Sequence, residues 1–174
     1  WCLAKLELDA KPGDFNSLYQ LLAESALNQP QCFVHRDFHS YNIHFSAAKK
    51  QGIALIDFQD GLWGPATYDL ASILHDRYIT WTDDQIDNAI EQYRQFAKIN
   101  TPPLEYRRQV LWVGLQRNIR ILGVFHRLNM RDGKSIYLDY VPRKASFCQR
   151  VFNLYPELHE FNGMPECFKQ AGWV

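Results

Sequence analysis

The sequence has no long apolar run. Its apolar stretches are only a handful of residues long, whereas a membrane-spanning helix needs about 20 consecutive apolar residues. The first residues also lack the basic segment and following apolar segment that are typical of a secretory leader. We therefore expect no membrane partner and a cytoplasmic location.

An excess of charge of either sign is also missing. The 19 lysines and arginines balance the 19 aspartates and glutamates, so no overall field would draw the chain to nucleic acid or to an anionic membrane. We expect no nucleic-acid partner. Any anionic substrate must be bound by local groups.

Cysteine is scarce, and its spacing argues against the common zinc sites. The four cysteines, Cys2, Cys32, Cys148 and Cys167, form no C-x-x-C pair. Free buried thiols are the simplest interpretation. Disulfides between Cys2 and Cys32 or between Cys148 and Cys167 remain an alternative, although a chain of 174 residues does not need one.

The composition and the periodicity that are present indicate a globular, mainly helical protein. With 47% apolar and 22% charged residues, the 174 residues suit one domain, residues 1–174. Apolar residues recur at helical spacing in segments 14–28, 65–78, 82–97, 104–128 and 142–154. Asp14 is placed to cap the first segment, Pro65 suits the first turn of the second, and Thr82 with Gln85 forms a capping box. The tail after residue 154 is predicted to be irregular.

Two short apolar segments, 43–45 and 53–56, flank a polar turn and predict a small antiparallel β-hairpin. The fold class is therefore α+β, mainly α, with about six helices and one hairpin. If Ile43 pairs with Ile56, then Asn42 and Asp57 lie opposite each other at the open end of the hairpin. An amide oxygen and a carboxylate oxygen at that separation suit a partly hydrated Mg²⁺ ion.

Asp37 lies just before the first strand of this hairpin. Its carboxylate is placed to accept a hydrogen bond from a substrate hydroxyl. Asp and Asn residues also cap turns frequently, but the two spacings together favour chemistry. We therefore predict a phosphoryl-transfer site with Asp37 as the catalytic base and with Asn42 and Asp57 as metal ligands.

The motif H-R-D-x-x-x-x-N is matched in full by His35, Arg36, Asp37 and Asn42, and Asp57-Phe58 stands where a D-F-G segment would follow. With the segment Gly64-Pro-Ala-Thr-Tyr-Asp-Leu-Ala, the chain resembles the aminoglycoside phosphotransferase and choline kinase superfamily, which has a protein-kinase-like fold. Within it, the chain is most similar to the bacterial anomeric N-acetylmuramate/N-acetylglucosamine kinases of cell-wall recycling. The features that point there are His-Arg-Asp in place of the commoner His-Gly-Asp, the pair Gln59-Asp60, and segments 114–118 and 130–134.

The resemblance implies roles for individual residues. Asp37 corresponds to the catalytic aspartate, Asn42 and Asp57 to the magnesium ligands, and ATP is the co-substrate. Asp69 corresponds to an aspartate that braces the catalytic loop by accepting backbone hydrogen bonds. His35 is interpreted as structural support packed under the loop.

Several side chains near the motif allow two interpretations. Arg36 and His39 flank the base and either touch a sugar hydroxyl or a phosphate, or brace the loop. Gln59 and Asp60 directly follow a metal ligand, which suggests contact with the substrate. The aromatic residues Tyr78, Trp81 and Trp112 either stack on a sugar ring or pack in the core.

The start of the chain departs from the pattern of this family. Kinases of this kind carry a β-rich nucleotide lobe before the catalytic loop, but only 34 residues precede His35, and they include no Gly-rich loop and no strand-borne lysine. We therefore expect a C-terminal lobe alone, which is inactive by itself, with the N-terminal lobe present in the parent protein.

The function that we expect is ATP- and Mg²⁺-dependent phosphorylation of a small-molecule hydroxyl, namely the anomeric hydroxyl of N-acetylmuramate or N-acetylglucosamine. One alternative keeps this chemistry with another acceptor, such as an aminoglycoside, choline or homoserine. A second alternative is a non-catalytic, pseudokinase-like binding module, which the missing lobe favours and the complete motif opposes.

Overall fold

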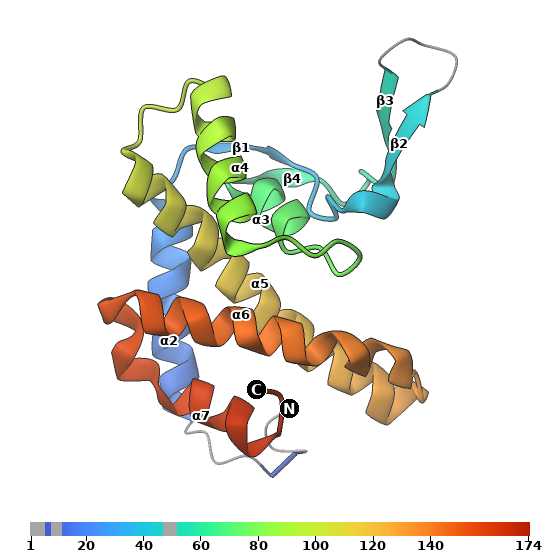
Figure 1. Ribbon diagram of the computed structural model, residues 1–174, viewed down its shortest axis with the longest axis vertical. Coiled ribbons are helices and arrows are strands. Elements are labelled where there is room, and N and C mark those ends of the chain that lie inside the picture. The colour runs from blue at the N-terminus through green and yellow to red at the C-terminus, as the bar shows by residue number, and fades with distance from the viewer. Residues whose placement is uncertain (1–5, 8–11, 47–51) are drawn as a thin grey trace. The chain divides into compact units, whose positions relative to one another are not determined.

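A computed structural model describes residues 6–7, 12–46 and 52–174 of the chain (Figure 1). The described part holds six α-helices and two short two-stranded sheets, which confirms the predicted mainly helical α+β fold. The chain divides into two compact units, one formed by residues 25–114 and one by residues 1–24 with 115–174. The single domain that we expected stays a prediction.

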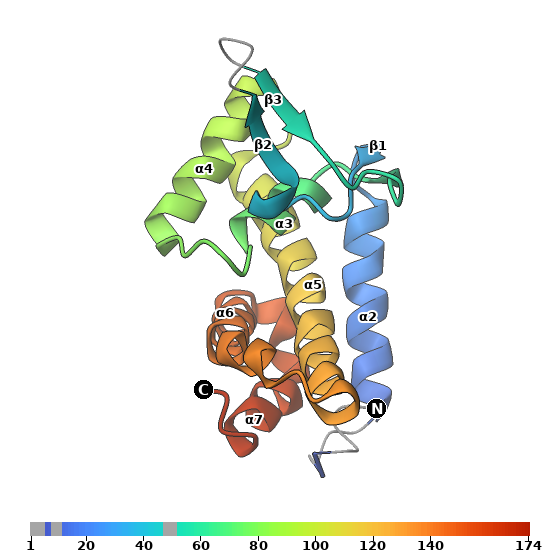
Figure 2. The ribbon, with the colours of Figure 1, turned by 90° about the vertical axis from the view of Figure 1, so that its right-hand side faces the viewer.

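The unit of residues 25–114 carries all four strands. The strand β1 (Gln31–Val34) pairs antiparallel with β4 (Leu62–Pro65), and β2 (Ile43–Ser46) pairs antiparallel with β3 (Gly52–Leu55) (Figures 1 and 2). A short 3-10 helix, η1 (Ser40–Asn42), leads into β2. The helices of this unit are α3 (Tyr68–Leu74), α4 (Asp83–Phe96) and the first part of α5 (Pro103–Asp132). Its buried apolar side chains include Val34, Ala71, Leu74, Ile86, Ile90, Tyr106 and Val110.

The β1–β4 sheet was not predicted. Each strand has four residues, and the two strands are far apart in the sequence, so no local turn signals their pairing. The expectation that Pro65 begins a helix was wrong, because Pro65 ends β4 opposite Gln31 and α3 begins three residues later. The capping box of α4 was predicted correctly. The Thr82 hydroxyl accepts from the Gln85 amide, and the Gln85 side chain accepts from the Thr82 amide.

The hairpin is confirmed, but its predicted register was wrong by one residue. Ile43 pairs with Leu55 rather than with Ile56, and Ser46 pairs with Gly52. The turn, residues 47–51, lies outside the described residues. Phe45, Ile53 and Leu55 on one face of the hairpin, and His44 and Ala54 on the other, are exposed. Neither face is therefore buried, and a strand pair without a buried face has weakly specified register. Apolar pattern alone therefore did not determine the pairing.

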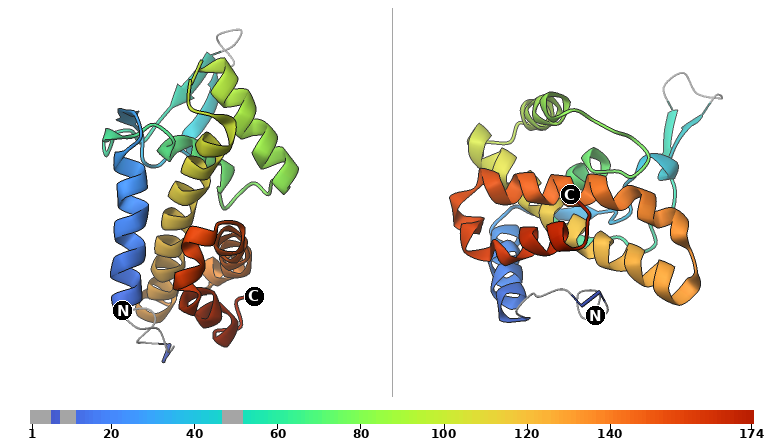
Figure 3. Two further views of the ribbon diagram at one scale, coloured as in Figure 1. Left: turned by 90° about the vertical axis from the view of Figure 1, so that its left-hand side faces the viewer. Right: turned by 60° about the horizontal axis from the view of Figure 1, so that its bottom comes forward.

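The other unit contains helices and connecting turns, and no strand, in its described residues. Besides most of α2 (Pro12–Leu27) and the second part of α5, it holds η2 (Ser135–Tyr140), α6 (Val141–Leu154), η3 (Pro156–Phe161) and α7 (Gly163–Gln170), with α6 and α7 packed together (Figure 3). The tail was predicted to be irregular, which was wrong, because Met164, Pro165, Cys167 and Phe168 form a buried face on α7. This burial outweighs the local preference of Gly163 and Pro165 for a turn.

Two further expectations concern helix ends and thiols. Helix α2 begins at Pro12, two residues before Asp14, whose side chain lies outside the described residues. Cys32, Cys148 and Cys167 are free, as expected, and Cys148 and Cys167 are fully buried. Cys2 lies outside the described residues.

Candidate active site

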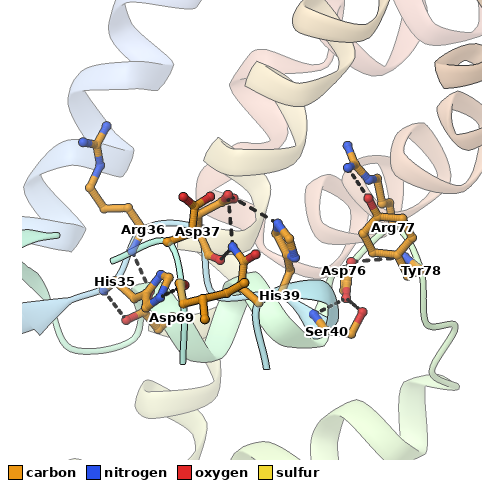
Figure 4. Close-up of polar contacts among 12 residues, drawn as sticks. His35, Arg36, Asp37, His39, Ser40, Asp69, Asp76, Arg77 and Tyr78 are labelled. Atoms are coloured by element: carbon orange, nitrogen blue, oxygen red, sulfur yellow. Dashed lines mark hydrogen bonds and ion pairs between the residues drawn. The ribbon is translucent and has the colours of Figure 1, made fainter. Parts of the chain in front are cut away.

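The loop that follows β1 places Asp37 at the surface, and other side chains of the loop contact its carboxylate. The side chain is 53% exposed. The side-chain nitrogen Nδ2 of Asn42 donates to the backbone oxygen of Asp37 at 2.9 Å and lies 3.3 Å from the carboxylate oxygen Oδ2 of Asp37. The ring nitrogen Nε2 of His39 lies 3.3 Å from the same oxygen (Figure 4). The carboxylate is therefore oriented by two neighbours and still open to solvent.

The beginning of this loop is held by Asp69, in the first turn of α3. One carboxylate oxygen accepts from the backbone amide of His35 at 2.6 Å, and the other accepts from the amide of Arg36 at 3.1 Å. Hydrogen bonds to a charged acceptor are stronger than neutral ones. Asp69 thus fixes the backbone directly before Asp37, which is the kind of contact that the resemblance implies for it.

His35 is buried and connects two parts of the site. Its Nε2 donates to the backbone oxygen of Ile56 at 2.9 Å. The amide of Ile56 in turn donates to the backbone oxygen of Asn42 at 3.1 Å. Ile56, the residue before Asp57, is therefore held through its backbone oxygen by His35 and through its backbone amide by Asn42.

The register found for the hairpin changes how Asn42 and Asp57 are related. Asn42 lies opposite Ile56, and Asp57 is the next residue, so the two candidate ligands are not a directly opposed pair. Asp57 has a φ of +67°, the left-handed region that non-glycine residues rarely occupy. The chain therefore turns at Asp57, where its Oδ1 accepts from the side chain of Gln59 at 2.8 Å.

Arg36 also has left-handed backbone, with a φ of +71°. Figure 4 shows its side chain extending away from Asp37, and its guanidinium donates to the backbone oxygen of Asp60 at 3.2 Å. The structure thus brings Arg36 together with Asp60, and His39 with Asp37. Gln59 contacts Asp57.

A second carboxylate that supports the loop was missed from the sequence. Asp76 accepts from the amide and from the hydroxyl of Ser40, at 2.9 and 2.6 Å, and from the amide of Tyr78 at 3.1 Å (Figure 4). The available signal was its spacing, because Asp76 follows Asp69 by seven residues, or about two helical turns, which predicts the same helix face.

The pKa of Asp76 reflects these contacts. The residue is only 5% exposed, and burial by itself would raise the pKa of its carboxyl. The hydrogen bonds from Ser40 and Tyr78, together with the nearby His39 ring, outweigh that effect and lower the pKa below its usual value.

Within the described residues, no group of three or more His, Cys, Asp or Glu side chains is arranged to hold a metal ion. An ion shared by one Asp, one Asn and substrate phosphates needs no such group. In the same part of the chain, no helix combines the length and the apolar character that crossing a membrane requires.

Comparison with known sequences agrees with the geometry. The sequence model of the phosphotransferase enzyme family matches residues 1–107, which include the whole loop and both of its carboxylate supports. The chain belongs to the phosphotransferase enzyme family. Arg36 has a left-handed backbone conformation, which glycine would adopt without steric cost.

Three curated relatives, each named N-acetylmuramate/N-acetylglucosamine kinase, are similar over most of the chain. The protein of Pseudomonas putida is 33% identical over 87% of this chain, that of Neisseria meningitidis 36% over 76%, and that of Pseudomonas aeruginosa 34% over 92%. These alignments cover 45%, 40% and 49% of the relatives' own lengths. The chain thus spans less than half the length of the curated relatives it matches.

The left-handed backbone at Arg36 leads to a prediction about stability. Replacing Arg36 by Gly or by Ala removes the same hydrogen bond to Asp60, but only Gly adopts positive φ freely. Arg36→Gly is therefore expected to be more stable than Arg36→Ala by about 1 kcal/mol, measured by thermal unfolding of the full-length protein. Gln92, an exposed residue within α4, is the matched control, because there the Gly variant should be the less stable one. Equal stability of the two variants at position 36 would contradict the argument.

The lowered pKa of Asp76 leads to a prediction about pH. The carboxylate stabilises the fold above its unfolded-state pKa, and this contribution is lost as the pH falls through the lower folded-state pKa. At neutral pH, Asp76→Asn is expected to cost about 1 to 3 kcal/mol. The difference from the wild type should stay constant above pH of about 5 and shrink below pH of about 4. Asp139→Asn, at an exposed position, is the control and should change the free energy of unfolding at neutral pH by less than about 0.5 kcal/mol. If the destabilisation by Asp76→Asn does not change with pH, the charged carboxylate of Asp76 is not the group that stabilises the loop.

Proposed function

We propose that the full-length protein transfers the γ-phosphoryl group of ATP to the anomeric hydroxyl of an amino sugar, N-acetylmuramate or N-acetylglucosamine. The single observation that carries the proposal is the Asp37 carboxylate, held by Asn42 and His39 yet 53% exposed. The phosphotransferase family supports the reaction class, and the names of the relatives support the acceptor. A cytoplasmic location, where ATP is available, is part of the proposal.

Asp37 is proposed to act as the base that orients the acceptor. Its Oδ2 is contacted by Asn42 and His39, so Oδ1 is the oxygen best placed to accept the hydrogen bond of the sugar hydroxyl. Because phosphoryl transfer passes through a loose transition state, alignment of the attacking oxygen matters more than strong basicity. A carboxylate that is oriented before the substrate binds suits this task.

Asn42 and Asp57 fit a magnesium ion by the chemistry of their donors. The amide nitrogen of Asn42 is used by Asp37, which leaves its amide oxygen for a cation, and Asp57 offers Oδ2 beside the Oδ1 that Gln59 contacts. Both are hard oxygen ligands, and Mg²⁺ is commonly bound by one or two carboxylates together with substrate phosphates. When bound, the ion would neutralise negative charge on the transferring phosphoryl group.

We further propose that a nucleotide-binding lobe outside these 174 residues supplies the remaining contacts to ATP. The chain spans less than half the length of its relatives. Apolar side chains are also exposed around the candidate metal ligands, on the hairpin and just after it, namely Phe45, Ile53, Leu55, Ile56 and Phe58. Exposed apolar patches of this kind mark surfaces that pack against another partner.

The role of Asp37 is tested by its isosteric replacement. In the full-length protein, Asp37→Asn keeps the size of the side chain but removes the carboxylate that accepts the hydroxyl proton. Turnover is expected to fall by about two to four orders of magnitude, whereas nucleotide affinity, measured by titration calorimetry, should change little. Asp139→Asn serves as the control and should retain wild-type turnover. Activity retained in Asp37→Asn would rule out the assignment.

The acceptor is tested by measuring ADP release with a panel of compounds. N-acetylmuramate and N-acetylglucosamine are expected to stimulate release in the presence of Mg²⁺ and not after its removal by a chelator, because the ion is needed for charge neutralisation. Stimulation by an aminoglycoside, choline or homoserine instead would keep the reaction class and replace the acceptor. No release with any acceptor, from a protein that nevertheless binds one of them, would favour the non-catalytic binding module.

A further inference from the structure

Tyr41 presents an aromatic ring to solvent within the catalytic loop. It lies in η1 between Ser40 and Asn42, and the residue is 65% exposed. Its ring stacks against that of Tyr78, with centroids 4.0 Å apart and planes tilted by 32°. An aromatic ring supported on one face and open on the other is preformed to receive a flat apolar surface.

Tyr78, the residue beneath Tyr41, is held by several contacts. Its backbone amide donates to Asp76, the carboxylate that also binds Ser40. The guanidinium of Arg77 lies 4.5 Å from the centre of its ring and hydrogen bonds with its hydroxyl. Tyr41 therefore stacks on a side chain that is held in place and does not rotate freely.

The same stack is connected to the candidate base. The ring of His39 meets Tyr78 edge-on, with centroids 5.9 Å apart, and its Nε2 lies 3.3 Å from Asp37. Figure 4 shows His39 between Asp37 and Tyr78. Tyr41 is also the residue directly before Asn42, whose side chain contacts Asp37. A single histidine thus separates the aromatic stack from the carboxylate.

We propose that the exposed face of Tyr41 is the platform on which the pyranose ring of the acceptor lies when its hydroxyl reaches Asp37. The inference rests on the proposed sugar kinase function and deepens it by assigning a substrate-binding residue. One face of a pyranose carries several C–H groups and little polarity, so it packs on an aromatic ring while the hydroxyls at its edge stay free to hydrogen bond. An acyclic acceptor such as choline or homoserine offers no such face.

The test compares three variants of the full-length protein, Tyr41→Ala, Tyr41→Phe and Phe96→Ala, by steady-state kinetics with N-acetylglucosamine at saturating ATP and Mg²⁺. Tyr41→Ala is expected to raise the KM for the sugar about tenfold, which corresponds to the usual contribution of one aromatic stacking contact. Its kcat and its KM for ATP should stay within about twofold of the wild type. Tyr41→Phe keeps the ring and should behave as wild type, as should Phe96→Ala, which removes an 87% exposed ring from α4.

Each other outcome overturns the proposal in a recognisable way. A raised KM for ATP in Tyr41→Ala would assign the ring to the nucleotide. A reduced kcat with an unchanged KM for the sugar, or equal damage in Tyr41→Phe and Tyr41→Ala, would assign it to the support of the loop. If the wild type phosphorylates the sugar and Tyr41→Ala has the same kinetic constants, the platform is ruled out and the proposed function stands. Failure of the wild type to phosphorylate any sugar would remove the proposed function and the platform with it.

Discussion

The carboxylate of Asp69 binds two consecutive backbone amides, those of His35 and Arg36, and the rest of the site depends on this contact. Directly after these two amides the chain bends, because Arg36 has a left-handed φ of +71°. The cost of the bend, on the order of 1 to 3 kcal/mol for a residue with a side chain, is offset by charge-assisted hydrogen bonds. Because of the bend, the chain leaves β1 with Asp37 directed to solvent.

The loop is held at a second point by Asp76, which binds the amide and hydroxyl of Ser40. Asp69 and Asp76 come from the same short stretch, within and just after α3, so one element determines where both ends of the segment 35–40 lie. Asp37 is between these two ends. Its carboxylate can therefore be positioned by the backbone, with only light side-chain contacts from Asn42 and His39, and it remains accessible to a substrate. Such preorganisation without burial suits a group whose task is orientation.

The sequence predicted the parts of this site that depend on local spacing. Asp37 and Asn42 are five residues apart in one loop, and their contact follows from a motif that is complete in the sequence. Helix α4 follows from its apolar periodicity, and its capping box follows from the hydrogen-bonding capacity of Thr82 and Gln85. The hairpin register did not follow, because a strand pair without a buried face offers no apolar pattern to align.

Contacts between distant residues were harder to predict. Asp76 bonds to a residue 36 positions earlier, and its only local signal is its helical spacing from Asp69. The sheet of β1 and β4 joins segments about 30 residues apart, and α7 forms because tertiary burial overrides the turn preference of Gly163 and Pro165. In each case the deciding free energy comes from a partner that the local sequence does not contain.

The corrected register gives a sharper account of how the backbone relates Asn42 to Asp57. Ile56, the residue before Asp57, donates its amide to the backbone oxygen of Asn42 and accepts from His35 on its own backbone oxygen. The first and last residues of the motif H-R-D-x-x-x-x-N thus bind the same peptide segment. Both contacts use the backbone of Ile56 and not its side chain. The chain then turns through the left-handed φ of Asp57. The backbone relation between the two candidate metal ligands therefore follows from two hydrogen bonds, one of which continues the register of β2 and β3, and from one backbone angle.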